Sequence, residues 1–457
     1  MNIKKPFNFI IIMLVIKFTF AQTIYGVIKD SDSNLLFGAT IYNSSNSKIG
    51  ITNEMGVFSV ESVKGENKLF ISYVGYTSKI ITLESTGDSI NMGSIVLVND
   101  SLDEIVISGT LRQVSKLKSA VPIELYTANF FKATPKASFF EAIEGINGVR
   151  PQLNCNICNT GDIHINGLEG PYTMVLIDGM PIVSSLATVY GLSGIPNSLV
   201  ERMEIVKGPA SSLYGSEAIG GLINIITKNP IKAPIVSADV MGTTWGELNA
   251  DFGIRFNLSK VISVLTGINY FNYNNPIDNN KDNFTDVTIQ KRISVFQKWN
   301  VKRRNNRLFT LVGRYYWEDR WGGEMDWTKE FRGGDEIYGE AISTERVEFI
   351  GQYQLPTSEH MMLSFSFNSH DQNSVYGDVP YIADQKIAFG QLTWDKSLGK
   401  HDLLFGSALR YTLYDDNTPA TGGDLNSPDN NPDEIWLPGI FVQDEITLSK
   451  TENAIYV

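Results

Sequence analysis

Cys155 and Cys158 are the residues of this sequence whose type and spacing could most directly do chemistry. Two cysteines this close can form a disulfide in an oxidising compartment, or they can supply two thiolate ligands to a metal ion. A zinc site would need two further ligands, and the nearest histidine, His164, supplies only one. We therefore expect a disulfide between Cys155 and Cys158 and no metal site.

Closely spaced glycines from Gly208 to Gly221 could form a phosphate-binding loop. The run has no Gly-Lys-Ser/Thr ending and no helical pattern at the right spacing, so it does not match a nucleotide site. The sequence also has no Ser/His/Asp elbow and no His-Glu-x-x-His motif. The Met361-Met362 pair fits a strand core better than a soft-metal site. No haem or metal pair is evident among His164, His360, His370 and His401. We therefore predict that the protein is not an enzyme and has no catalytic residue and no cofactor.

The first residues predict an export signal. Lys4-Lys5 precedes an apolar run over residues 7–20, and Thr19-Phe20-Ala21 offers small residues at the two positions that a signal peptidase reads. The run is too short for an ordinary membrane-spanning helix. We expect a cleaved signal peptide over residues 1–21. No later stretch reaches the about 20 apolar residues of a transmembrane helix, which leaves a periplasmic protein or a β-barrel.

The formal net charge of −12 argues against nucleic-acid binding. A phosphate-binding surface depends on clustered Lys and Arg, and the basic clusters of this sequence are short. We therefore exclude nucleic acid as a partner.

Residues 22–98 alternate short apolar strands with glycine-bearing turns, which predicts a small β-sandwich. The segments Gly26–Asp30, Gly38–Ile41, Thr52–Phe58 and Ser72–Tyr76 together resemble the carboxypeptidase-regulatory-like domain. The resemblance implies a structural module. Peptidase activity would need a His/Glu set of zinc ligands, and the sequence of this domain shows none.

Residues 99–116 form an acidic linker that runs into a β-branched stretch, Ile105-Val106-Ile107. One interpretation is a plain connecting strand. The other is an unpaired strand that a periplasmic partner captures by β-augmentation, in which main-chain hydrogen bonds supply the affinity.

Residues 117–230 have a mixed α/β pattern. Residues 137–145 predict a short amphipathic helix that ends at a glycine. Residues 162–167 and 174–182 predict strands, the second with a tight turn at Asp178-Gly179. Residues 195–228 carry further strands together with the glycines described above.

Residues 231–457 change to long strands with a period of two. In residues 248–257 apolar side chains alternate with Asn249, Asp251, Arg255 and Asn257. Several strands sustain about ten residues, longer than the five or six usual in a soluble sandwich and sufficient for a transmembrane barrel. We predict about ten such strands, near residues 235–242, 247–257, 261–273, 290–301, 307–317, 345–355, 361–370, 386–396, 402–414 and 438–449.

The connections between these strands give a second test. Short turns, such as residues 258–260, alternate with longer loops near residues 274–289, 318–344, 371–385 and 415–437, as in bacterial outer-membrane barrels. Residues 454–457 resemble the opening of an eleventh strand without a closing partner. An open sheet in lipid would leave unpaired backbone groups, so we expect the sequence to be a fragment that lacks about half of the barrel.

The run from Glu201 to Lys228 matches the plug signature of TonB-dependent outer-membrane receptors almost continuously, and the whole of residues 117–228 resembles that plug. The segment before it resembles the Ton box, with the residues Leu102, Asp103, Glu104, Ile105, Val106, Ile107 and Ser108. The resemblance implies a mainly β protein with an N-terminal β-sandwich, an α/β plug domain and an antiparallel transmembrane β-barrel. It also implies that TonB, with its inner-membrane energising complex, binds the Ton box and drives import across the outer membrane.

Substrate contacts are expected in two plug loops that face outward in the family. The candidate residues are Asn154, Asn156, Asn159, Ser184, Ser185 and Tyr190, although packing against the barrel wall would also explain either loop. The plug signature resembles that of receptors for metal chelates, such as ferric siderophores, haem or cobalamin. Two alternatives remain: a glycan importer that works with a surface lipoprotein, and a surface receptor for adhesion or signalling.

Overall fold

The computed structural model describes residues 23–30, 33–44, 47–61, 65–73, 76–85, 89–97, 105–111, 114–116, 119, 121–133, 136–155, 160–182, 192–422, 427–448 and 453–456. The chain divides into two compact units, Met1–Glu104 and Ile105–Val457, which are described separately. The predicted signal peptide over residues 1–21 lies outside the described residues.

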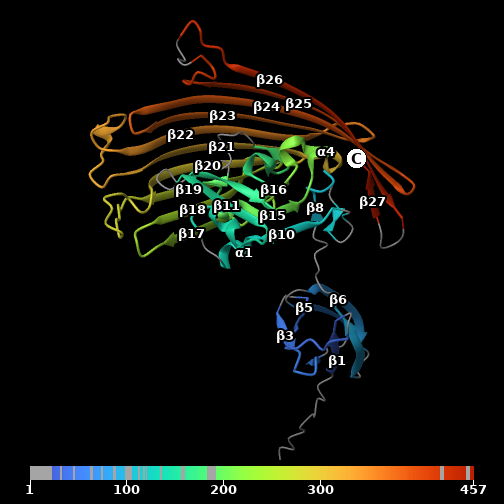
Figure 1. Ribbon diagram of the computed structural model, residues 1–457. Coiled ribbons are helices and arrows are strands. Elements are labelled where there is room, and N and C mark those ends of the chain that lie inside the picture. Colours follow the sequence, from blue (N-terminus) through green and yellow to red (C-terminus); the bar gives the residue numbers. More distant parts are fainter. Residues whose placement is uncertain are drawn as a thin grey trace, which may run out of the picture. The chain divides into compact units, whose positions relative to one another are not determined.

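The first unit is a small sandwich of two β-sheets, shown in blue in Figure 1. One sheet has the order β4-β1-β7, and the other has the order β3-β2-β5-β6. Alternate residues of the strands point into one apolar core that includes Ile24, Ile41, Phe58 and Ile71. The strands are β1 (Thr23–Lys29), β2 (Thr40–Tyr42), β3 (Lys48–Ile51), β4 (Val57–Glu61), β5 (Gly65–Tyr73), β6 (Tyr76–Ser85) and β7 (Ile90–Val96).

The second unit begins with a compact α/β domain, which we call the plug. Its central sheet has the order β10-β15-β16-β13-β14, with β13 parallel to β16 and the other pairs antiparallel. The sheet strands are β10 (Ile123–Thr127), β13 (Thr173–Ile177), β14 (Met180–Pro181), β15 (Val200–Lys207) and β16 (Gly221–Thr227). Two hairpins accompany the sheet, made of β8 (Ile105–Val106) with β9 (Val114–Ser115) and of β11 (Val149–Cys155) with β12 (Thr160–Ile165).

The helices of the plug are short. They are α1 (Ala128–Ala133), α2 (Phe139–Ala142) and α4 (Ser211–Tyr214), with 3-10 turns at Ile143–Gly145, Gly170–Tyr172, Asn197–Leu199 and Ser216–Ala218. The predicted helix over residues 137–145 is therefore α2 followed by a 3-10 turn, and Ser138 caps it by accepting a hydrogen bond from the Glu141 N–H. Among the described residues, no helix is long and apolar enough to cross a membrane.

The turn predicted at Asp178-Gly179 is confirmed. Both residues have positive φ, 49° and 81°, and they join β13 to β14 as a two-residue hairpin.

The rest of the unit is an eleven-stranded antiparallel sheet, β17 to β27 in sequence order, which we call the wall sheet. It curves around the plug (Figure 1). Its strands are β17 (Val236–Gly242), β18 (Leu248–Asn257), β19 (Ile262–Tyr273), β20 (Ile289–Val301), β21 (Phe309–Gly323), β22 (Gly339–Gln354), β23 (His360–Tyr376), β24 (Val379–Leu398), β25 (His401–Asp416), β26 (Asp433–Thr447) and β27 (Asn453–Tyr456). Further 3-10 turns lie at Arg304–Asn306 and Lys329–Phe331.

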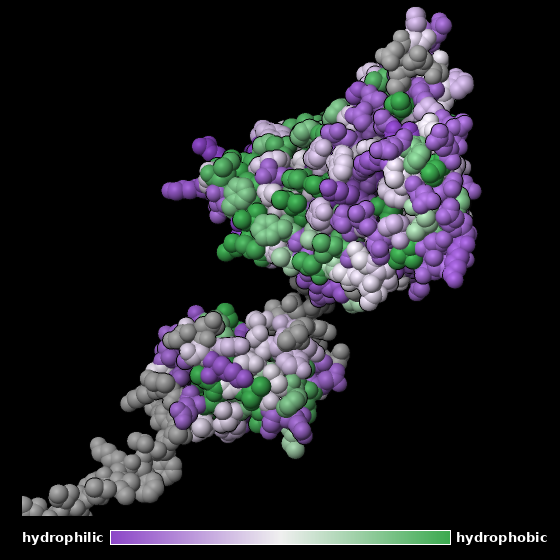
Figure 2. Space-filling model, turned by 90° about the vertical axis from the view of Figure 1, so that its left-hand side faces the viewer, coloured by the Kyte–Doolittle hydropathy of each residue, from purple (hydrophilic) through white to green (hydrophobic). Residues whose placement is uncertain are grey.

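The two faces of the wall sheet reverse the usual pattern of a soluble protein. The face toward the plug buries polar residues such as Asn249, Asp251 and Asn368. The outer face exposes large apolar residues, among them Phe252, Phe256, Ile268, Val295, Phe349, Phe365, Phe367 and Val442. Figure 2 shows hydrophobic residues gathered on one flank of this unit. An apolar outer face with polar residues inside is typical of strands that face lipid.

One predicted loop is wrong. Residues 371–385 were expected to form a long connection, but β23 and β24 continue and meet at the two-residue turn Gly377-Asp378. The prediction followed the apolar alternation, which stops where outward residues become polar, as at Asp371 and Asn373. Hydrogen bonding between the two strands continues beyond that point, and Gly377 supplies the positive φ of 64° that the tight turn requires.

Gly221, at the start of β16, is required for close packing inside the plug. Its φ is +139°, and an added Cβ would lie 2.2 Å from the carbonyl oxygen of Val206 on β15. We expect Gly221→Ala to destabilise the plug by about 1–3 kcal/mol because the neighbouring strand must move. The measurement is hydrogen exchange of β15 and β16 amides in the full chain. As a control, Gly390→Ala in β24 has nothing within 4 Å of the added Cβ, and equal exchange in the two variants would contradict the prediction.

Candidate functional site

The described part of the predicted Ton box, residues 105–108, lies inside the plug. Ile105 and Val106 form β8, which pairs with β9, and Val106 is fully buried in an apolar cluster with Ile123, Val206 and other plug residues. Leu102, Asp103 and Glu104 lie outside the described residues. The sequence left open a connecting strand or an unpaired strand. In the described residues Ile105 and Val106 pair with β9, Val106 and Ser108 are buried, and Ile107 is partly exposed.

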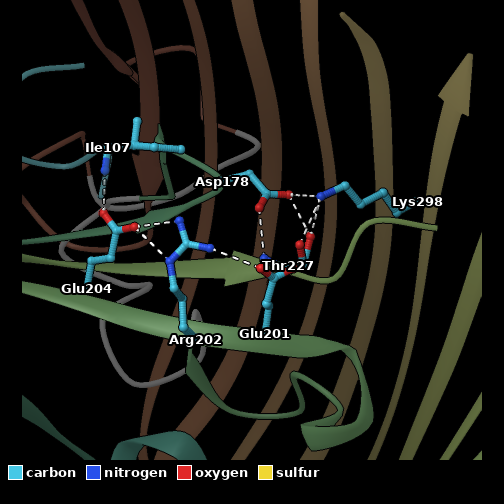
Figure 3. Close-up of polar contacts among 7 residues, drawn as sticks. All are labelled: Ile107, Asp178, Glu201, Arg202, Glu204, Thr227 and Lys298. Atoms are coloured by element: carbon cyan, nitrogen blue, oxygen red, sulfur yellow. Dashed lines mark hydrogen bonds and ion pairs between the residues drawn. The ribbon is translucent and has the colours of Figure 1, made fainter. Parts of the chain in front are cut away.

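Glu204, on β15, holds the end of this segment. Its Oε2 accepts hydrogen bonds from the Ile107 N–H at 2.9 Å, the Ser108 N–H at 2.9 Å and the Ser108 hydroxyl at 2.7 Å. Its Oε1 accepts from Nε and Nη2 of Arg202 at 3.0 and 2.8 Å. Figure 3 shows the carboxylate between Ile107 and Arg202. Because Glu204 is fully buried, these five hydrogen bonds compensate a charge that would otherwise be costly to bury.

Ser108 is held from two further sides. Its hydroxyl accepts a hydrogen bond from the Asn224 side chain on β16 at 2.9 Å, and its carbonyl accepts from the Tyr214 hydroxyl on α4 at 3.1 Å. Burial, together with the charge of Glu204, raises the pKa of Tyr214 above its ordinary value, so the hydroxyl keeps its proton and remains a donor. Ser108 therefore bonds to three separate elements of the plug.

The position of Glu204 follows from the pairing of the plug sheet. β15 lies between β10 and β16, and Glu204 is opposite Leu125 on one side and Asn224 on the other. A pull on the chain before Ser108 would therefore act on an inner strand of the sheet through Glu204.

A second polar centre joins the plug to the wall sheet. Asp178, in the β13–β14 turn, accepts hydrogen bonds from the Thr227 N–H at 2.8 Å and the Thr227 hydroxyl at 2.7 Å. Lys298, on β20, approaches the same carboxylate at 2.8 Å and also donates to the Thr227 hydroxyl at 2.7 Å (Figure 3). The Gln352 side chain, on β22, donates to the Asp178 carbonyl at 2.9 Å. The end of the plug sheet is thus attached to two strands of the wall.

Arginines of the wall sheet also hold the plug backbone. Arg292 donates to the carbonyl of Ala137 at 3.1 Å, Arg346 donates to that of Ile182 at 2.9 Å, and Arg314 donates to that of Ser193. Arg410 forms a two-pronged ion pair with Glu217 of the plug at 2.5 and 2.9 Å. The plug is therefore held both by polar contacts, which water could replace if the two parts separated, and by apolar packing against wall residues such as Leu265, Phe296 and Val312.

The predicted plug loops are described only at their edges. Asn154 is exposed near the end of β11, and Cys155 is disulfide-bonded and packs near Tyr316 and Ile342 of the wall sheet. Asn156, Cys158, Asn159, Ser184, Ser185 and Tyr190 lie outside the described residues. The Cys155–Cys158 pairing and the substrate contacts of both loops stay predictions.

Three of the histidines each lie beside a single aspartate. His164 lies 2.8 Å from Asp162, His401 lies 2.7 Å from Asp444, and His360 lies 3.9 Å from Asp395. Within the described ranges, no group of three or more His, Cys, Asp or Glu side chains could hold a metal ion.

Sequence reasoning did not single out Glu204, Arg202 or Asn224 as functional residues. A signal was present, because Glu204 stands among the apolar residues Met203, Ile205 and Val206, and a buried charge requires a partner. Arg202, two residues away on the same strand, could have been inferred as one partner, but Ser108 could not, since it is 96 residues away in the sequence.

Two family models match the chain, each over less than half of its length. Residues 115–222 match the TonB-dependent Receptor Plug Domain, and residues 24–107 match the CarboxypepD_reg-like domain.

Two curated relatives resemble the chain over short regions. The Ferric enterobactin receptor PirA of Pseudomonas aeruginosa is 35% identical over 142 residues, which cover 28% of this chain and 19% of the relative. The Vitamin B12 transporter BtuB of Vibrio cholerae is 26% identical over 167 residues, which cover 36% of this chain and 27% of the relative. Each match therefore spans less than a third of the relative's length.

Solved structures show the fold. The siderophore receptor PirA from Acinetobacter baumannii aligns with a TM-score of 0.55 at 16% identity, over 73% of this chain and 55% of that one. The siderophore receptor PirA from Pseudomonas aeruginosa aligns with a TM-score of 0.52 at 17% identity, over 72% of this chain and 53% of that one. The chain thus spans about half the length of these structures, and the predicted fold class is confirmed.

Removing the charge of Glu204 should loosen the attachment of residues 105–108 to the plug sheet. In Glu204→Gln we expect the Ile107 and Ser108 amides to exchange at least about tenfold faster, because hydrogen bonds to a charged acceptor are lost. Hydrogen exchange read by mass spectrometry measures this. The matched control is Glu201→Gln on the same strand, since Glu201 is half exposed and forms an ion pair with Arg202 at 3.2 Å. Unchanged exchange in Glu204→Gln would show that the carboxylate does not hold the segment.

Breaking the Lys298–Asp178 pair should weaken attachment of the plug to the wall. The side chains are only 9% and 11% exposed, so we expect Lys298→Met to destabilise the plug by about 3 kcal/mol because Asp178 is left buried without its cation. The double variant Asp178→Asn/Lys298→Met should recover most of this loss. Urea titration of the plug amides measures both effects, and a double variant no more stable than the single one would contradict the pairing.

Proposed function

We propose that this chain, a TonB-dependent receptor with an N-terminal CarboxypepD_reg-like domain, takes part in importing a metal chelate across the outer membrane. The relatives named above are receptors or transporters, which agrees with a protein that binds and moves a ligand without chemistry. The ferric enterobactin receptor and the vitamin B12 transporter each have a metal chelate in their names, and this supports the same substrate class here.

The observation that carries the proposal is the contact of Ile107 and Ser108 with Glu204. In the proposed mechanism TonB binds residues 102–108, and its inner-membrane complex supplies the energy. Force on this segment then acts through Glu204 on β15, an inner strand of the sheet that fills the space beside the wall. Displacing that sheet opens a route for the substrate.

Two features of the wall sheet support the proposed location in the outer membrane. Its strands β19 to β26 have 12 to 20 residues, more than the about 9–11 that cross a bilayer. Their outer face exposes apolar side chains, while the buried polar residues face the plug. A soluble sandwich would place its apolar residues on the inner face.

TonB binding through residues 102–108 is tested by backbone and side-chain variants of the full-length protein. We expect Ile105→Pro to abolish binding of the purified periplasmic domain of TonB, because proline removes an N–H that β-augmentation uses. Asp103→Asn should change the affinity by less than about threefold, since main-chain bonds supply most of it. Equal binding of both variants would contradict this interaction.

Deleting residues 102–108 tests the transport itself. The deletion should abolish growth on ferric siderophore, haem or cobalamin as the limiting nutrient, while the protein still reaches the outer membrane. Unchanged uptake would overturn the transporter proposal and favour an adhesion or signalling receptor. Uptake of an oligosaccharide in place of every chelate would favour the glycan importer.

A further inference from the structure

The inner face of β20–β22 carries an excess of buried positive charge. Residues directly opposite in the register share a face, and the pairs Arg292↔Glu318 and Arg314↔Glu348 identify the face toward the plug. The buried charged residues on this face are Arg292, Lys298, Arg314, Arg320, Arg346, Glu318 and Glu348. Five cations less two carboxylates leave a net charge of +3. One further inward carboxylate, Glu340, is only partly buried, at the end of β22 near the longer loops.

The two glutamates are shared between arginines. Glu318 pairs with Arg320 and lies 3.6 Å from Arg292. Glu348 pairs with Arg346 and lies 3.1 Å from Nη1 of Arg314. Each carboxylate therefore neutralises one of its two guanidinium groups. One positive charge remains beside Glu348, whereas Arg292, beside Glu318, also interacts electrostatically with the buried Asp251 on β18.

The plug covers most of this charge and neutralises only part of it. Asp178 supplies one carboxylate, to Lys298, and Glu141 of the plug interacts electrostatically with Arg292. Arg292, Arg314 and Arg346 instead donate to plug carbonyls, which accept hydrogen bonds but carry no net charge. These arginines would lose their plug acceptors whenever the plug moved away from the wall.

Arg346 has a hydrogen-bond donor that is not used. Its side chain is fully buried, and its Nη1 has no hydrogen-bond partner among the described residues, although Nε and Nη2 each donate a hydrogen bond. The Thr344 hydroxyl, on the same face of β22, is another buried donor without a partner among the described residues. Buried polar groups of native proteins are normally satisfied, so such a group needs a specific explanation.

We infer that the inner face of β20–β22 is a cationic lane along which an anionic substrate passes when the plug is displaced. The inference rests on the proposed import function and narrows its substrate class to chelates with net negative charge. Carboxylate, phosphate or catecholate oxygens can take the place of the plug carbonyls as acceptors from Arg292, Arg314 and Arg346. A net charge of +3 on the wall of the path attracts an anion and disfavours a cation.

A purely structural role for the arginines predicts a different behaviour. If they only hold the plug, removing one changes how easily the plug is displaced and leaves unchanged which ions pass afterwards. Charge selectivity of the open path therefore separates the two roles.

The first experiment measures ion selectivity of the full-length receptor in planar bilayers, with the plug displaced reversibly by urea and a KCl gradient across the membrane. Arg292→Gln/Arg346→Gln should lower the ratio of chloride to potassium permeability several-fold relative to the natural sequence. The matched control is Lys291→Gln, which removes a cation of the same strand from the exposed outer face and should leave the ratio unchanged. An unchanged permeability ratio in the double variant would contradict the cationic lane, even if the plug were displaced at a lower urea concentration.

The second experiment uses two probes of different charge, ferric enterobactin, which is anionic, and cyanocobalamin, which has no net charge. We expect cells to import the ferric catecholate alone, and we expect Arg346→Gln to reduce its uptake about tenfold, as for a lost charged hydrogen bond, with surface binding unchanged. Import of cyanocobalamin alone would overturn the lane and keep the proposed function. Import of an oligosaccharide and of no chelate would overturn the proposed function, and the bilayer ratio would still decide whether the lane exists.

Discussion

The buried carboxylate of Glu204 is the constraint around which the plug is organised. A charge with no exposure to water must be compensated by nearby donors, and Arg202, Ile107 and Ser108 supply them. Two of these donors are backbone N–H groups of the segment that precedes the plug. The fold of the sheet and the docking of that segment therefore depend on each other, because the Glu204 carboxylate has all its hydrogen bonds only when both are in place.

The contact between plug and wall adds polar bonds to an apolar core that the two parts share, since Leu265, Phe296, Val312 and Ile350 of the wall pack with the plug core. Within the plug, apolar residues such as Ile177, Ile205 and Ile225 pack together and exclude water. Across the interface, guanidinium groups and Lys298 donate to carbonyls, hydroxyls and one carboxylate. Apolar packing favours staying together, whereas polar contacts can be exchanged for water at little net cost. The polar contacts of the interface can therefore be exchanged for water, whereas its apolar contacts favour the docked state.

The sequence predicted the architecture well because periodicity is local. Alternation in residues 248–257 identified both the strand and its inward polar residues, and the Asp178-Gly179 pair identified its turn. The contacts that carry the site are remote in sequence, and no local pattern specifies them. Glu204 meets Ser108 across 96 residues, and Lys298 meets Asp178 across 120. The sequence also failed to predict where β23 ends. Its hydrogen bonding to β24 continues past the last outward apolar residues, so the alternation of apolar residues stops before the strand does.

The length of the β23–β24 hairpin affects how a ligand would first contact the protein. Its strands have 17 and 20 residues and close with only two, so much of the hairpin extends beyond the about 9–11 residues per strand that a bilayer requires. A flexible loop of that length would lose conformational entropy when it ordered around a ligand. A hydrogen-bonded ribbon is already ordered, so it can present its tip as a preformed arm and engage a ligand without that loss.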